Sequence, residues 1–236
     1  MRIKVILPIN HAGLNSATEE EIAPAMAPDM EFDIANLADG PEFIENRFDD
    51  SRAVPEVLRL GRQAEQDGYD GIFVDCFTDP GVEVLRECVS IPVLGAFVPA
   101  LLTSNAIAQR YAIVTAVPGV VPLYIQLARN LAQSDNVVAI RHVNMPVREM
   151  EDRDRLCEGL FTQSVEAVGM GAQAIVLGCT GMLGVAQRLR TRQNGSGVPA
   201  PVVDPTVAGI CMLQALIRQR LGGSPLCYAR HAEEPE

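Results

Sequence analysis

The stretch that decides the fold is GIFVDCFTDPG, residues 71–81, in which an apolar run ends in Asp75 and Cys76 and then breaks at Thr-Asp-Pro-Gly. A second stretch, AIVLGCTGMLG at residues 174–184, repeats the order of an apolar run, a cysteine, a threonine and glycines. Short β-branched runs bounded by glycine and proline are typical of buried strands. Each cysteine is therefore expected at the carboxyl end of a strand.

Short β-branched runs alternate along the chain with longer segments of helical periodicity. This alternation is the signature of βαβ units and predicts an α/β fold with parallel sheets. Three amphipathic helices are expected over residues 53–68, 153–171 and 206–223, each with glycine at its end. The strands are expected at residues 3–8, 31–37, 71–75, 91–95, 111–116, 137–143, 174–178 and 201–205.

The chain contains two similar halves. A predicted helix leads into GYDGIFVDC at residues 68–76, and another leads into GAQAIVLGC at residues 171–179. Internal similarity of this kind indicates duplicated, pseudo-symmetric units. We expect a first α/β lobe of residues 1–97 plus 206–236 and a second of residues 98–205, because the last helix can return to the first half.

The composition narrows the class of protein. The 236 residues are 48% hydrophobic, which is enough apolar sequence for a sizeable core. The formal net charge is -11, which disfavours nucleic acids and anionic membranes as partners. No apolar run approaches the roughly 20 residues needed to span a bilayer, and MRIKVILPIN is expected to be a strand, not a signal peptide. We therefore expect a cytoplasmic protein that acts on a small molecule.

The six cysteines are expected to be reduced thiols, because their spacing is irregular and no secretory signal is present. No CxxC pair occurs and the three histidines lie far from any cysteine in sequence, so no metal site is expected. Cys157 and Cys211 within predicted helices, and Cys88 and Cys227 near element ends, are interpreted as packing residues.

Cys76 and Cys179 differ from the other four because both follow predicted parallel strands. Function gathers at such strand ends, where helix N-termini point outward. Backbone N–H groups and a helix dipole there are expected to favour the thiolate and to lower its pKa below about 8.5. Strand alternation is expected to turn Asp75 away from the thiol. The matching positions in two halves favour a functional pair over core packing.

Two opposed thiols suit the inversion of a carbon stereocentre. One base must remove a proton from one face, and an acid on the other face must return one. A thiolate and a thiol that flank the substrate then exchange roles with its handedness. The carbanion needs hydrogen-bond donors, which backbone N–H groups and the hydroxyls of Thr78, Thr115 and Thr180 are expected to supply.

Five stretches, in register from residue 1 to about residue 215, resemble a known superfamily. They are residues 40–58, DCFTDPGVEVLRE at 75–87, YAIVTAVPGVVPLY at 111–124, VLGCTGM at 176–182 and PVVDPTVAGI at 201–210. At these residues the chain resembles the aspartate/glutamate/hydantoin racemases, and most closely the hydantoin racemase branch, which includes allantoin racemases.

The resemblance implies two Rossmann-like or flavodoxin-like lobes with the active site in the cleft between them. It also implies racemisation without a cofactor, with Cys76 and Cys179 as the acid and base, in a homo-oligomer. By the same resemblance, the substrate pocket is lined by Asn10, Phe77, Thr78, Thr115, Thr180 and Gly181.

Departures from the family pattern bear on the substrate. LPINHAGLN, residues 7–15, stands where the family has an NPNTS loop, and Phe43 stands where the branch usually has serine, whereas Glu45 is retained without an assigned role. Compared with glutamate racemases, Phe77 replaces an asparagine and Gly181 a histidine. The loss of two polar groups favours a neutral ring, such as a 5-substituted hydantoin or related cyclic ureide, over a charged amino acid.

Three alternatives remain open. An amino-acid racemase of the Asp/Glu type would need a counter-charge; no arginine lies within either cysteine motif, but Arg110 or Arg141 could reach the cleft. A maleate isomerase or an arylmalonate decarboxylase-like enzyme is the second, although the presence of both cysteines favours racemisation. The third is a two-lobed ligand-binding protein in which both thiols only pack.

Overall fold

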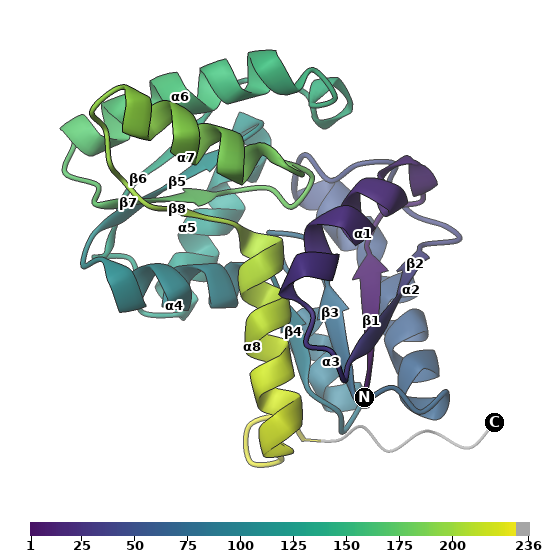
Figure 1. Cartoon of the computed structure of the whole chain (residues 1–236). Coiled ribbons are helices and arrows are strands. Elements are labelled where there is room, and N and C mark those ends of the chain that lie inside the picture. Colours follow the sequence, from purple (N-terminus) through teal and green to yellow (C-terminus); the bar gives the residue numbers. More distant parts are fainter. Residues whose placement is uncertain (230–236) are drawn as a thin grey trace.

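The computed structural model describes residues 1–229 and contains two four-stranded parallel sheets (Figure 1). The first sheet has the order β2-β1-β3-β4 and the second the order β6-β5-β7-β8, so the second repeats the first with every strand displaced by four. This repetition confirms the predicted α/β fold with two similar lobes. The strands are β1 (Arg2–Leu7), β2 (Glu31–Asn36), β3 (Gly71–Val74), β4 (Val93–Gly95), β5 (Tyr111–Thr115), β6 (Val137–His142), β7 (Ala174–Leu177) and β8 (Val202–Val203).

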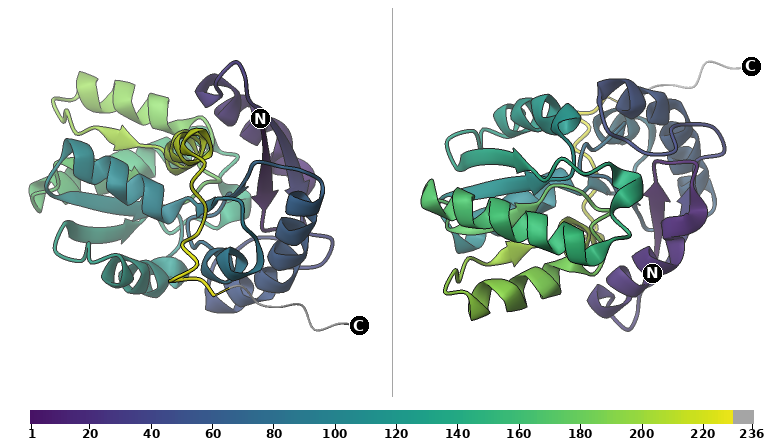
Figure 2. Two further views of the ribbon diagram at one scale, coloured as in Figure 1. Left: turned by 90° about the horizontal axis from the view of Figure 1, so that it is seen from below. Right: turned by 90° about the horizontal axis from the view of Figure 1, so that it is seen from above.

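Helices cover both faces of each sheet (Figure 2). In the first lobe α2 and α3 pack on one side and α1 and α8 on the other; in the second, α6 and α7 lie opposite α4 and α5. None of the helices within residues 1–229 is long and apolar enough to cross a membrane. The helices are α1 (Asn15–Ile22), α2 (Arg47–Gln66), α3 (Val82–Cys88), α4 (Phe97–Ile107), α5 (Val121–Asn130), α6 (Arg153–Gly169), α7 (Val185–Gly195) and α8 (Pro205–Gln219), with short 3-10 turns η1 (Ala12–Leu14), η2 (Ala23–Ala25), η3 (Pro118–Val120) and η4 (Val147–Glu149).

The helix termini follow local capping chemistry. α2 starts earlier than residue 53 because the Asn46 side chain accepts hydrogen bonds from the N–H groups of Phe48 and Asp49. The expected glycine end of the last helix is wrong. α8 ends at Gln219, and Arg220 takes the left-handed conformation (φ 55°), in which its N–H donates to the carbonyl oxygens of the last turn.

The two cysteine-bearing turns have matching backbones. Gly81 (φ 73°, ψ 0°) precedes α3, and Gly184 (φ 70°, ψ 3°) precedes α7. Each glycine lies five positions after its cysteine, since 76 and 81, and 179 and 184, differ by five. Left-handed backbone favours glycine, so the same residue ends both turns. The pseudo-symmetry therefore extends from the topology to single residues.

One apolar core joins the two lobes. A continuous buried cluster includes Val5 and Phe73 of the first sheet, Phe97 of α4, and Ile113 and Val176 of the second sheet. α8 packs against the first sheet and α4 against strands of both sheets. The boundaries of the two lobes at residues 97/98 and 205/206 stay a prediction, and residues 230–236 of the proposed first lobe lie outside the described residues.

The remaining thiols are not all packed. All cysteines within residues 1–229 are free, and Cys157 is buried as expected. Cys88 is half-buried, with its thiol donating to the Val84 carbonyl. Cys211 and Cys227 are exposed, so the interpretation of these two as packing residues is wrong. The sequence predicted where Cys211 and Cys227 lie along the chain, but not on which side of the helix or turn each thiol lies.

Candidate active site

Both predicted catalytic cysteines line one cavity between the lobes. Cys76 follows β3 after Asp75, and Cys179 follows β7 after Gly178, so the ends of two central strands bring the thiols to the same place. The cavity is partly open, and its empty volume, including the space that opens to solvent, is about 480 Å³. Its wall consists of Leu7, Pro8, Ile9, Leu14, Thr18, Phe43, Ile44, Asp75, Cys76, Val147, Cys179, Thr180, Gly181 and Leu183.

The wall of the cavity is mainly apolar. Among residues 1–229, no arginine, lysine or histidine lines it. Arg110 is exposed, and Arg141 on β6 binds Gln163 and Glu166, so neither candidate counter-charge reaches the wall. His11, Arg148 and Arg153 line an adjoining outer hollow. In the part of the chain that the structure describes, the cavity wall therefore offers no cation to a substrate carboxylate.

The Cys76 thiol lies in a tight turn at the end of β3. Its Sγ atom is 3.2 Å from Thr78 Oγ1. Burial raises the pKa of the Cys76 thiol strongly, the hydroxyl and N–H of Thr78 oppose this rise, and the charges of Asp50 and Cys179 add to it. Desolvation of the thiolate thus outweighs the hydrogen bonds that stabilise it.

The Cys179 thiol has a similar environment on the other lobe. Burial raises its pKa to about 11, the N–H groups of Gly181 and Met182 lower it, and the charges of Asp75 and Glu45 raise it. The prediction of a lowered thiol pKa is therefore wrong for both cysteines. The backbone N–H groups act in the expected direction, but the loss of water around a buried thiolate has the larger effect.

The comparison with known proteins agrees with this geometry. Residues 13–213 match the family described as Asp/Glu/Hydantoin racemase. The chain belongs to this family. It is 31% identical over 219 residues to a hydantoin racemase of Rhizobium meliloti, covering 92% of this chain and 89% of that protein.

Solved structures of this racemase family superpose on the whole chain. Allantoin racemase from Klebsiella pneumoniae is 28% identical, with a TM-score of 0.92, and covers 99% of this chain and 95% of that one. Allantoin racemase from Pseudomonas fluorescens is 25% identical, with the same TM-score of 0.92, and covers 100% and 99%. The resemblance drawn from the cysteine motifs is confirmed.

Within this racemase-family site, Asp75 is a cavity residue that the sequence did not indicate. Its carboxylate accepts a hydrogen bond from Thr206 Oγ1 on α8 (2.8 Å). Asp75 also lines the cavity, and its charge raises the pKa of Cys179. Burial, opposed by Thr206, raises the pKa of Asp75 itself to about 7.

The structure separates the six predicted substrate-binding residues into two groups. Thr180 and Gly181 line the cavity. Phe77 does not: in the turn after β3, its ring is 1% exposed and packs against Phe97 and Tyr124. Asn10, Thr78 and Thr115 are also absent from the wall, and Asn10 is exposed.

The predicted hydroxyl donors already have partners. Thr180 Oγ1 donates across the lobes to the Asp75 carbonyl (3.0 Å), and Thr115 Oγ1 donates to the Gly178 carbonyl (2.9 Å). Thr78 Oγ1 contacts the Cys76 thiol. These hydroxyls therefore hold the cysteine turns in place, and the backbone N–H groups beside Cys179 are the better candidates to stabilise negative charge.

Tyr124 and Asp50 are further site residues that the sequence did not single out. Tyr124 on α5 donates its hydroxyl to the Gly178 carbonyl (2.7 Å), which fixes the residue before Cys179. Asp50 on α2 faces Thr78, and burial raises its pKa. A buried tyrosine needs a hydrogen-bond partner, but only the tertiary fold shows which one. No group of His, Cys, Asp or Glu suited to a metal ion occurs in residues 1–229.

Proposed function

We propose that this chain is a cofactor-independent racemase that inverts C5 of a 5-substituted hydantoin or related cyclic ureide, with Cys76 and Cys179 as the acid/base pair. The observation that carries the proposal is the position of these two thiols, which line one cavity from matching strand ends of two similar lobes. The hydantoin and allantoin racemases among its relatives support the substrate class. We further propose a homo-oligomer, as the resemblance implies, and a cytoplasmic location, as the composition of the chain suggests.

The proposed reaction transfers one proton on each face of the ring. A thiolate on one side takes the C5 proton and becomes a thiol, while the electron pair left on C5 spreads onto the adjacent carbonyl oxygen. The thiol on the other side gives its proton to C5 and becomes a thiolate. Charge is conserved, no group leaves, and Cys76 and Cys179 end with exchanged protonation states.

The burial of both thiols suits this chemistry. A thiol whose pKa is raised gives a stronger base once it is ionised, which brings it closer to a weak carbon acid. The N–H groups of Gly181 and Met182 favour the ionised form of Cys179. The fraction of enzyme that carries one thiolate increases as the pH rises toward the thiol pKa values.

The apolar wall supports a neutral ring over a charged substrate. A dicarboxylate or an amino acid would bury its charge beside the Asp75 carboxyl without a basic partner from the wall. This observation disfavours an Asp/Glu-type racemase as well as a maleate isomerase or arylmalonate decarboxylase. Leu7, Ile9, Ile44 and Leu183 instead provide apolar contacts for a ring substituent.

A panel of single-enantiomer compounds tests the proposal. We expect loss of circular dichroism from 5-benzylhydantoin or allantoin, measured against the rate without enzyme, and no racemisation of aspartate or glutamate. Maleate is expected to be unchanged. Turnover of aspartate, glutamate or maleate without any effect on hydantoins would contradict the proposal, and tight hydantoin binding without exchange of the C5 hydrogen would favour a ligand-binding protein.

A further inference from the structure

A segment of the first lobe crosses to the second lobe at the wall of the cavity. We call residues 41–47, which precede and begin α2, the strap. Its Glu45 side chain reaches the second lobe, where Oε1 accepts a hydrogen bond from the backbone N–H of Val147 (2.7 Å). Val147 starts the η4 turn between β6 and α6. This hydrogen bond therefore joins the two lobes directly.

Two further contacts hold the strap against the second lobe. A Cβ atom on Gly119, in the η3 turn, would lie 2.3 Å from the Glu45 carbonyl oxygen, so only glycine allows this close approach. Arg47 donates to the Pro122 carbonyl (3.3 Å) and to Gln126 Oε1 (3.2 Å). These contacts fix the strap relative to the second lobe. Glu45 directly follows Ile44, which lines the cavity.

The two sides of the Glu45 hydrogen bond both form the cavity wall. Phe43 and Ile44 of the strap line the same cavity as the cysteines, and so does Val147. The Phe43 ring also packs against His11, with ring centroids 5.3 Å apart. A change in the position of Glu45 would therefore displace wall residues from both lobes.

We infer that Glu45 is a positioning residue, whose carboxylate holds the strap to Val147 and so keeps Phe43, Ile44 and Val147 in place as a wall over the two cysteines. For catalysis, this inference rests on the proposed racemase function. It assigns a role to a glutamate that matches the family pattern but that the sequence alone left without one.

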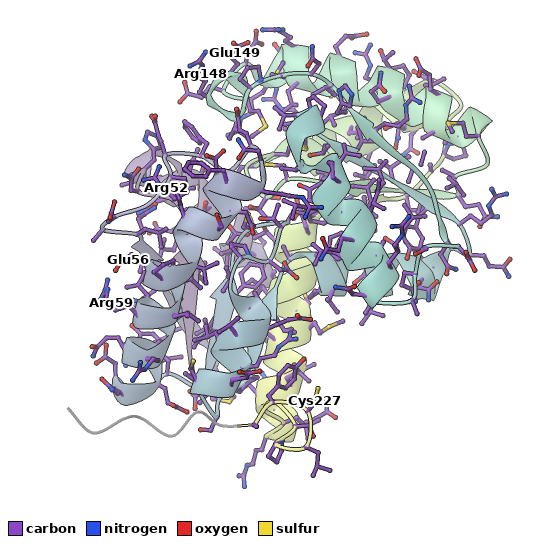
Figure 3. The ribbon with its side chains drawn as sticks, turned by 180° about the vertical axis from the view of Figure 1, so that it is seen from behind. Arg52, Glu56, Arg59, Arg148, Glu149 and Cys227 are labelled. Atoms are coloured by element: carbon purple, nitrogen blue, oxygen red, sulfur yellow. The ribbon has the colours of Figure 1, made fainter. Side chains whose placement is uncertain are left out.

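The charges around Glu45 come from both lobes. Asp49 accepts a hydrogen bond from the Glu45 N–H (3.1 Å). Glu42, Arg52 and Arg148 line a surface hollow together with Glu45, and this hollow is a different one from that lined by His11 and Arg153. Figure 3 shows Arg52 on the first lobe and Arg148 on the second, on the same side of the molecule. The hollow contains both signs of charge, so the effect of Glu45 must be isolated with matched variants.

Three substitutions separate the hydrogen bond of Glu45 from its charge. Glu45→Gln keeps an oxygen that can accept from Val147 but removes the charge. Glu45→Asp keeps the charge but withdraws the oxygen by one methylene group. Glu45→Ala removes both, and Glu42→Ala, which changes an exposed acid of the same strap, is the control.

The first measurement is the racemisation of a hydantoin. We expect kcat/KM to fall by about tenfold to a hundredfold in Glu45→Ala and Glu45→Asp, because wall residues move, and to stay within about threefold in Glu45→Gln. Glu42→Ala is expected to match the wild type. Equal kcat/KM in the wild type and in all three Glu45 variants would overturn the inference.

The pH profile adds a readout that a purely structural role would not change. The groups whose charges act on Cys179 are Asp75 and Glu45, together with Cys76 and Tyr124. Removal of the Glu45 charge lowers the pKa of the Cys179 thiol, so its thiolate forms at lower pH. For one enantiomer, the rise of kcat/KM with pH is therefore expected at lower pH in Glu45→Gln, which keeps the hydrogen bond, than in the wild type. An unchanged pH profile in Glu45→Gln would contradict an action of the Glu45 charge on Cys179.

A second measurement does not depend on racemase activity. Iodoacetamide labelling of Cys179, quantified by peptide mass spectrometry against the exposed Cys227, is expected to be several-fold faster in Glu45→Ala than in Glu45→Gln. Both variants lack the charge, so the difference reports the opening of the wall. Equal labelling would overturn the inference. Faster labelling in a chain that racemises no hydantoin would support the role of Glu45 and contradict the proposed function.

Discussion

Cys76→Ser and Cys179→Ser are each expected to lower the rate of hydantoin racemisation by about a thousandfold. A serine hydroxyl ionises far less readily than a thiol, so the variant lacks a base on one face and a suitable acid for the reverse direction. Circular dichroism of a single enantiomer, started from each hand in turn, measures the loss. Both variants keep the volume and turn geometry of the site nearly unchanged, because oxygen replaces sulfur at one atom.

The control for this experiment is Cys211→Ser, which changes an exposed thiol on α8. It is expected to racemise both enantiomers at the wild-type rate. Proton transfer by two thiols would be contradicted if either Cys76→Ser or Cys179→Ser kept the wild-type rate from both enantiomers. A loss in only one of them would leave a mechanism with a single cysteine.

Phe77→Ala is expected to reduce the free energy of unfolding by about 3–5 kcal/mol. The ring is 1% exposed and packs edge-on against Tyr124 of the second lobe, with centroids 5.0 Å apart at 87°, and against Phe97 at 5.1 Å. Its removal leaves a cavity in the core that joins the lobes. Urea unfolding followed by circular dichroism, with wild type and variant compared at one pH, measures the change.

Phe77→Leu is the matched control for the loss of ring volume. It refills part of the space with apolar atoms and is expected to cost clearly less than the alanine variant. A value for Phe77→Ala within about 1 kcal/mol of the wild type would contradict the core position of Phe77. Such a result would favour the earlier expectation that the ring lines the substrate pocket.

The strands and the cysteine positions were predictable because they depend on local patterns. A strand is expected at each β-branched run. In the structure Cys76 follows strand β3 and Cys179 follows strand β7. The repeated motif also predicted the second sheet, whose strand order matches that of the first. Function gathers at the carboxyl ends of parallel strands, so each thiol could be placed at that edge of its own sheet. That the two edges face each other across one cleft came from the family resemblance.

Properties that depend on tertiary contacts were not predictable. The direction of the thiol pKa shifts depends on how completely the wall excludes water, which a motif does not encode. The partner of Glu45 lies 102 residues away along the chain. Asn10 was assigned by alignment with a loop whose sequence this chain does not share, and it is exposed in the structure.

The most direct test of the central claim is racemisation of one hydantoin enantiomer in D2O near neutral pH, stopped at low conversion. Two thiols on opposite faces should place solvent deuterium at C5 of the newly formed enantiomer, while the remaining starting enantiomer keeps its hydrogen. Chiral chromatography with mass spectrometry separates the two, and a sample without enzyme corrects for spontaneous exchange. Deuterium that enters the starting enantiomer as fast as the product would show that one group acts on both faces, and would contradict the account.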